Sequence, residues 1–150
     1  FRWPTVTVPN GAPITSATLS LYVTSTADDT PTGATVGMQD ADDAATFTTG
    51  TNDISGRTRT STVTWSGSNI GDGWKTLDLT SQVQEVANRA GWASGNAMAA
   101  ILAGVSGINL TVTAWDGTPS QAAKLDIVYT VASGGMAVKA AHYARMRQGG

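Results

Sequence analysis

The chain offers few side chains that could perform acid–base or nucleophilic chemistry. It has a single histidine, His142, a single glutamate, Glu85, and no cysteine. A Ser-His-Asp triad would require His142 to fold back from near the C-terminal end onto the rest of the chain. Thiol nucleophiles and thiolate metal sites are excluded because both need cysteine. We therefore predict that the protein is not an enzyme and has no catalytic residues.

Carboxylates leave two other chemistries open. A glycosidase needs only two carboxyl groups that flank the scissile bond, so a hydrolase is the third function considered. The densest acidic group is Asp40, Asp42 and Asp43, within Gln-Asp-Ala-Asp-Asp-Ala-Ala. Oxygen ligands at this spacing can hold Ca²⁺, although the loop glycine and final glutamate of a calcium-binding hand are missing. The alternative is a strand-end loop whose aspartates cap backbone N–H groups, and no cofactor is then expected.

Tryptophans are the residues that most suggest binding of a ligand. There are five in 150 residues, and a flat sheet could expose two or three of them to sugar rings. Trp115 is the best candidate because it follows an alternating segment, on the face opposite Leu110 and Val112, and precedes the turn Asp116-Gly117. We predict Trp115 and Asp116 as carbohydrate-binding residues. The competing interpretation is that tryptophans are buried with their N–H groups paired.

Composition and charge exclude several classes of partner. Charged residues make up 13% and hydrophobic residues 41% of the chain, as in a packed domain rather than a disordered one. Residues 1–133 carry a net charge of −5, which opposes binding to nucleic acid. The longest apolar run, residues 97–103, is far shorter than the roughly 20 residues that span a bilayer, so no membrane partner is predicted. The chain begins at Phe1 rather than Met, so we expect an upstream portion.

Hydrophobic periodicity predicts a mostly β fold. The chain holds 12 Ser, 23 Thr and 17 Gly, which favour turns and pleated surfaces over helices. Apolar residues alternate with polar ones over residues 17–24, the pattern of a strand with one buried face. Further strands are predicted at residues 6–8, 35–39, 60–65, 74–79, 97–102, 108–115 and 124–131.

One segment has the period of a helix. Val83, Val86, Ala87 and Ala90 share one helical stripe, which predicts a short helix at about residues 80–90. Ser81 and Gln84 have capping-box spacing, and Gly91 is placed to end the helix in a left-handed conformation. Eight strands with a single helix favour antiparallel connections, so we predict an all-β, two-sheet β-sandwich of about eight strands.

Residues 134–150 differ from the preceding β-sandwich domain, residues 1–133. The boundary is Ser133-Gly134-Gly135, and the segment after it has a net charge of +3 with no acidic residue. We predict a C-terminal tail or linker that is helical in part. Met136, Ala140, Tyr143 and either Met146 or Arg147 then lie on one side at helical spacing, and they are the candidate residues for docking to a neighbouring subunit. A solvated tail is the alternative.

Four segments between residues 14 and 131 carry a resemblance to a known family. They read ITSATLSLYV (14–23), QDADDAATF (39–47), LDLTSQVQEV (77–86) with GWASGN (91–96), and WDGTP (115–119) before Lys124-Leu125. Together they resemble jelly-roll β-sandwich modules, described as DNRLRE-type or carbohydrate-binding-like, of bacteriophage virion proteins and bacterial secreted proteins. The resemblance implies a jelly-roll order of strands and carries no catalytic motif. Residues 97–103 are smaller than is usual in such modules, and residues 134–150 have no counterpart.

The resemblance leads to two functional hypotheses. The first is a bacteriophage virion structural protein, a capsid decoration, collar or tail component, with other virion subunits as partners and the virion as its location. Such a protein would be a homo-oligomer or part of a larger assembly, and it could also contact surface glycans. The alternative is a carbohydrate-binding module of a secreted or cell-surface protein. Both hypotheses describe a chain that works by adhesion.

Overall fold

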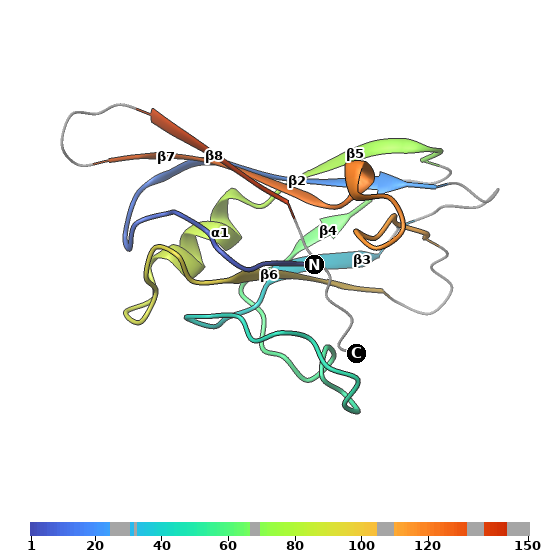
Figure 1. Ribbon diagram of the computed structural model, residues 1–150, viewed down its shortest axis with the longest axis horizontal. Coiled ribbons are helices and arrows are strands. Elements are labelled where there is room, and N and C mark those ends of the chain that lie inside the picture. Colours follow the sequence, from blue (N-terminus) through green and yellow to red (C-terminus); the bar gives the residue numbers. More distant parts are fainter. Residues whose placement is uncertain (25–30, 32, 67–69, 105–109, 132–136, 144–150) are drawn as a thin grey trace.

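The computed structural model describes residues 1–24, 31, 33–66, 70–104, 110–131 and 137–143. Within these ranges the chain forms eight strands in two layers, one α-helix and one 3₁₀ turn (Figure 1). The predicted all-β two-sheet sandwich with one short helix is confirmed. The strands are β1 (Arg2–Trp3), β2 (Ile14–Val23), β3 (Ala34–Met38), β4 (Val63–Trp65), β5 (Gly73–Asp78), β6 (Met98–Ala103), β7 (Lys124–Thr130) and β8 (Ala137–Tyr143); the helix is α1 (Thr80–Ala87), and the 3₁₀ turn is η1 (Pro119–Gln121).

Each layer is an antiparallel sheet of four described strands. One has the order β1-β6-β3-β4 and the other β5-β2-β7-β8. Strands that follow one another in sequence mostly lie in different sheets. Among the described strands, the exceptions are the pairs β3–β4 and β7–β8, which are neighbours both in sequence and in a sheet. The chain therefore crosses repeatedly between the layers, and each sheet combines early and late parts of the sequence, as in double-sheet sandwiches.

The core lies between the two layers and consists of the inward residues of alternating strands. In β2 the buried positions are every second residue from Ala17 to Val23. Leu19 lies opposite Leu125 of β7, and both side chains are fully buried. Met38 of β3 and Met98 of β6 close the core from the other sheet. The period of two in the sequence thus becomes one dry face on each sheet.

Residues 6–8 follow the predicted alternation but do not join a sheet. Val6 and Val8 are fully buried, yet the Val6 N–H donates to the Asn96 carbonyl at 3.0 Å rather than to a strand ladder. The Tyr129 hydroxyl donates to the Thr7 carbonyl at 2.9 Å. This segment is therefore an extended strap between the sheets, and the strand predicted there is wrong because its polar groups find loop and side-chain partners.

Helix α1 ends earlier than predicted and is capped differently. It spans Thr80–Ala87, and Ser81 makes no capping hydrogen bond; instead, the Asp78 carboxylate accepts from the Thr80 N–H at 2.9 Å. The hydrogen bond from the Thr80 hydroxyl, and after it the one from the Thr80 N–H, lower the pKa of Asp78. Gln84 accepts from the Ile14 N–H at 2.7 Å, so it binds the start of β2 rather than capping the helix. No helix among the described residues is long and apolar enough to cross a bilayer.

The helix predicted in the tail is wrong over residues 137–143, which form β8. This strand pairs with β7 along its whole length, from Lys124 opposite Tyr143 to Thr130 opposite Ala137. The domain boundary predicted after residue 133 therefore does not separate these residues from the sandwich. Alanine favours a helix in isolation, but the segment also alternates, and pairing with a buried strand outweighs local propensity.

The strand predicted at 108–115 does not form over the described residues 110–115, which have a single isolated bridge. Val112 makes an isolated bridge with Val23, and the Thr113 N–H donates to the Tyr22 carbonyl at 2.9 Å. Residues 108 and 109 lie outside the described ranges. The segment is thus attached to the end of β2, and Trp115 follows in a turn.

Substitution of Leu21 tests whether the inner face of β2 carries the stability of the fold. Leu21 is fully buried in the main core. We expect Leu21→Ala to lower the free energy of unfolding by about 2–5 kcal/mol, through lost burial and the cavity that remains. Thr76→Ala, at an exposed position of β5, is the control and should change it by no more than about 0.5 kcal/mol. Urea denaturation followed by tryptophan fluorescence measures both, and equal effects of the two substitutions would contradict the assignment.

Candidate functional site

The predicted calcium residues bind protein groups. Asp42 accepts from Arg89 Nε at 2.7 Å, and Asp40 pairs with Nη1 of the same guanidinium. The hydrogen bond that Arg89 donates to Asp42 is the largest cause that raises the pKa of Arg89. Asp43 accepts from the Ala97 N–H at 2.8 Å. These contacts attach the loop after β3 to the segment between α1 and β6.

Gly91 belongs to the same contact. It has no positive φ, so it does not end the helix in the predicted left-handed conformation; its role is to admit the Asp42 carboxylate, which a Cβ at this position would overlap. Among the described residues, no group of three or more histidine, aspartate or glutamate side chains could hold a metal ion. Asp43 thus caps a backbone N–H, whereas Asp40 and Asp42 pair with a side chain, and Ca²⁺ at these two residues would have to displace Arg89.

The five tryptophans divide into core and surface residues. Trp3, Trp65 and Trp92 are buried in the core, and the Trp92 indole N–H donates to the Val8 carbonyl at 2.9 Å. Trp115 is half-buried and its neighbour Asp116 is exposed. Trp74 is the most exposed at 39%, and it was not among the predicted site residues. The sequence of β5 indicates that Trp74 points outward. Side chains alternate along a strand, so Leu77 and Leu79 point inward, and Trp74, Thr76 and Asp78 point outward.

The outer face of the β5-β2-β7-β8 sheet combines aromatic and polar side chains. Residues directly opposite each other in a sheet share a face. Tyr22 lies opposite Trp74, and Ser20 lies opposite both Thr76 and Lys124. Thr18 lies opposite both Asp78 and Asp126. We call these residues the outer face: Thr18, Ser20 and Tyr22 of β2, Trp74, Thr76 and Asp78 of β5, and Lys124 and Asp126 of β7.

Trp74 is held in place by its neighbours on the outer face. The rings of Trp74 and Tyr22 meet edge to face, with centroids 5.4 Å apart and planes at 86°. Lys124 extends across Ser20, and its Nζ lies 4.0 Å from the centroid of the Trp74 ring. An ammonium group over a ring is attracted by the negative face of the π system. The result is an oriented, partly exposed indole beside hydroxyl, carboxylate and ammonium groups.

A second organised surface is the loop between β3 and β4, which projects away from the sandwich in Figure 1. Its centre is Arg57, whose side chain is only 9% exposed and lies 4.5 Å above the Phe47 ring. All five guanidinium N–H donors have partners at 2.7–3.0 Å: the Asp53 carbonyl and carboxylate, Gln39 Oε1, and the carbonyls of Ala45 and Thr46. One arginine therefore fixes the course of this loop.

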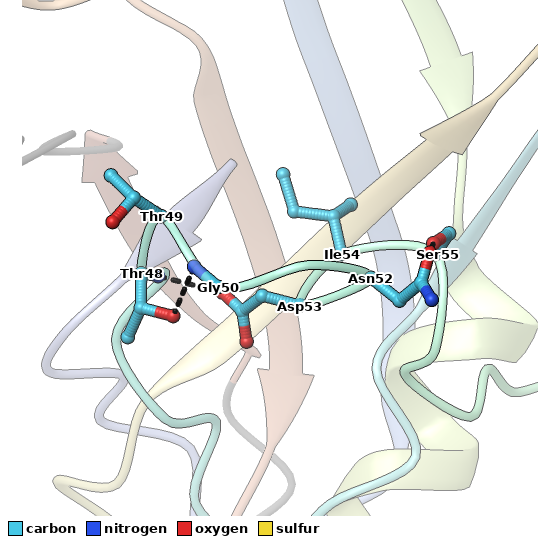
Figure 2. Close-up of a pocket in the computed structure, with 7 residues that line it drawn as sticks. All are labelled: Thr48, Thr49, Gly50, Asn52, Asp53, Ile54 and Ser55. Atoms are coloured by element: carbon cyan, nitrogen blue, oxygen red, sulfur yellow. Dashed lines mark hydrogen bonds between the residues drawn. The ribbon is translucent and has the colours of Figure 1, made fainter.

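The tip of this loop surrounds a shallow hollow of about 320 Å³ (Figure 2). Hydroxyl and amide groups line it, together with Ile54, which is 50% exposed. Asp53 is occupied: its carboxylate binds the Thr48 N–H and Arg57, and these bonds lower its pKa. The hollow offers hydrogen bonds and one apolar side chain, with no acid–base pair for catalysis among its lining residues.

The predicted docking residues do not form a common stripe. Ala140 lies opposite Ile127 and packs against the core, and the backbone of Tyr143 pairs with Lys124. A period of two replaces the helical period over residues 137–143. Met136 and Arg147 lie outside the described residues.

His142 points inward from β8. Burial is the main influence and lowers its pKa, against weaker opposing effects of a hydrogen bond with the Thr5 backbone and the charge of Asp126. Its Nε2 is buried and has no hydrogen-bond partner among the described residues. This geometry favours a neutral imidazole that helps to attach the edge strand.

Comparisons of the chain with protein-family models, curated proteins and solved structures give no match. The jelly-roll resemblance of the sequence thus remains an expectation, and the functional argument depends on the surfaces described above.

Arg57→Lys tests the organisation of the β3–β4 loop. Lysine has three donors on one nitrogen and cannot reproduce the planar fork. We expect hydrogen exchange at the Thr48 amide, which bonds to Asp53, to become at least about tenfold faster while the sandwich stays folded. Arg59→Lys is the matched control, since the Arg59 side chain has one hydrogen-bond partner within the described ranges, Thr35. Unchanged exchange in Arg57→Lys would contradict the role of this arginine.

His142 gives the fold a dependence on pH. Its folded-state pKa lies below the ordinary 6.5, so the unfolded chain binds more protons and stability is lost as the pH falls below about 6.5. We expect acidification from about pH 7 to about pH 5 to lower the free energy of unfolding less in His142→Gln than in the wild type. Urea titrations at several pH values measure this, and parallel slopes would refute the effect.

Proposed function

We propose that the chain is a non-enzymatic adhesion module and that the outer face binds a glycan through Trp74. The observation that carries the proposal is an indole 39% exposed on a flat sheet, oriented by Tyr22 and Lys124. An exposed indole offers a ligand a large apolar contact area together with a polar N–H group. Among the described residues, Ile54 is the only other exposed large hydrophobic.

The chemistry of the outer face suits a sugar. A pyranose ring has an apolar C–H face, which packs against the flat π face of an aromatic ring, and a rim of hydroxyl groups that need donors and acceptors. Thr76, Ser20 and Thr18 supply hydroxyls in the two rows next to Trp74, and Asp78 and Asp126 supply carboxylates. Because the sheet fixes all these positions, little side-chain entropy is lost on binding.

The predicted residues Trp115 and Asp116 extend this proposal. Their segment is attached to β2 by the bond from the Thr113 N–H to the Tyr22 carbonyl. Tyr22 is also the partner of Trp74 in the sheet, so the segment and Trp74 belong to the same end of β2. Trp115 is half-buried, and we assign it the secondary role and Trp74 the main one.

The sequence resemblance supplies the biological setting that we propose. It favours a bacteriophage virion component that presents the sandwich for assembly or attachment to a host surface. A secreted or cell-surface carbohydrate-binding protein would use the same face. In both settings the function is adhesion, and the two differ in what the rest of the particle or protein contributes.

Trp74→Ala is the decisive substitution. On a glycan array or in affinity electrophoresis, we expect it to weaken retention of a bound glycan by roughly tenfold or more, the scale of a truncated aromatic anchor. Ile54→Ala removes the other exposed large hydrophobic, lies in the β3–β4 loop, and should leave retention unchanged. Circular dichroism checks that both variants fold. Absence of binding by the wild type across a broad array would reject the glycan proposal, and turnover of a glycoside would reject the non-enzymatic one.

A further inference from the structure

Strand β8 presents a long edge. It pairs with β7 through all seven of its residues, and within the described part of the chain nothing pairs with its other side. The outward N–H and C=O groups of such an edge can extend the sheet with a further strand. Bulges, prolines and charged side chains, lysine in particular, usually prevent this. Ala137–Tyr143 contains no proline and pairs with β7 without a register shift, so Lys139 is the one feature of this kind in the strand.

The other described edges are less suited to extension. β1 has two residues and β4 has three. β5 has six, but it begins at Gly73, whose φ of 102° departs from strand geometry. Among these edges β8 is therefore the longest regular one.

We infer that β8 pairs with β8 of a second copy of this chain, antiparallel and around a two-fold axis at Ala140. All seven residues then have a partner: Ala140 faces the other Ala140, Lys139 faces Ala141, Val138 faces His142, and Ala137 faces Tyr143. Such a pairing forms about six to eight backbone hydrogen bonds. A two-fold axis perpendicular to the sheet joins the two four-stranded sheets into one and keeps both outer faces on the same side.

Charge complementarity supports a second copy as the occupant. Asp126 lies opposite Ala141, so in this register Lys139 of the other copy continues the same row beyond Ala141. The Cα atoms of Lys139 and Asp126 are then two strand spacings, about 10 Å, apart, and a lysine can reach across the small alanine. In the single chain, Lys139 makes one long contact with a described residue, its own Asp126 at 3.9 Å, and its side chain is 69% exposed. The two-fold axis produces the intermolecular pair twice.

The same charges select the register. Placing the axis at Lys139 would set two lysines directly opposite each other, and like charges in that position destabilise a sheet. Placing it at Ala140 puts an alanine opposite each lysine and uses the full strand. The inference does not depend on glycan binding, although a dimer of this kind would present two outer faces together and increase avidity for a repetitive surface.

Sedimentation velocity tests the pairing. Between about 1 and about 500 µM, the range where weak association becomes measurable, we expect the wild type to shift from monomer to dimer. Ala141→Lys should reduce dimer formation by at least about tenfold, because the new side chain directly faces Lys139 of the other copy. It should preserve the folded monomer, since it lies opposite Asp126 within its own sheet.

Two further variants control for charge and for folding. Ala137→Lys adds the same charge to the same face of β8, but at a position that does not face Lys139 of the other copy. This variant should dimerise like the wild type. Combining Ala141→Lys with Lys139→Glu places opposite charges across the interface and should restore the dimer. Thermal unfolding at low concentration checks that each monomer is intact.

The outcomes separate cleanly. Loss of the dimer in Ala141→Lys and its restoration in the double variant support the pairing. A wild type that stays monomeric over the whole range overturns it, as would happen if another segment of the chain covered the edge. A dimer unaffected by Ala141→Lys, or growth into open-ended oligomers, also overturns it.

Discussion

Burial of two alternating apolar faces against each other is the constraint on which the structure depends. Leu19 and Leu21 of β2 and Leu125 and Ile127 of β7 are fully buried, and they come from strands more than a hundred residues apart in sequence. The strap carrying Val6 and Val8 and the buried side of α1 close the open sides of the same core. With no cysteine in the chain, stability comes from this packing and from hydrogen bonds.

Two arginines hold the loops in place through hydrogen bonds and ion pairs, as disulfides do in other small domains. All five guanidinium N–H groups of Arg57 donate to acceptors in one loop and its surroundings. Arg89 joins the loop after β3 to the segment after α1 through Asp40 and Asp42. In both cases a single planar guanidinium replaces many weaker contacts, because its donors point in fixed directions that match carboxylate and carbonyl acceptors. These carboxylates therefore serve the fold.

The outer surfaces are free of the packing constraint, and they are where function can develop. Once Ala17, Leu19, Leu21 and Val23 of β2 and Leu77 of β5 are committed to the core, the even-numbered residues of both strands can be chosen for binding without cost to folding. The outer face uses this freedom for an indole, a phenol and an ammonium group in contact. The edge of β8 uses it for one lysine near one aspartate. Adhesion and self-association can therefore occupy adjacent parts of one sheet.

The sequence by itself determined the fold class, the inward positions of β2, β5 and β7 and the place of α1, because each depends on a local period in which side chains face one core. It also predicted that the Asp40–Asp43 loop could be capped rather than metal-bound. Only the tertiary structure decided which strand pairs with which, that residues 137–143 are a strand although their composition favours a helix, and that Arg89 is the partner of Asp40 and Asp42. It also showed that Trp74 is the exposed tryptophan. The strand order and the Arg89 ion pairs join segments far apart in sequence, and such contacts leave no local periodicity to detect. A period of two was present locally at Trp74 and over residues 137–143, but only pairing with β2 and β7 made it decisive.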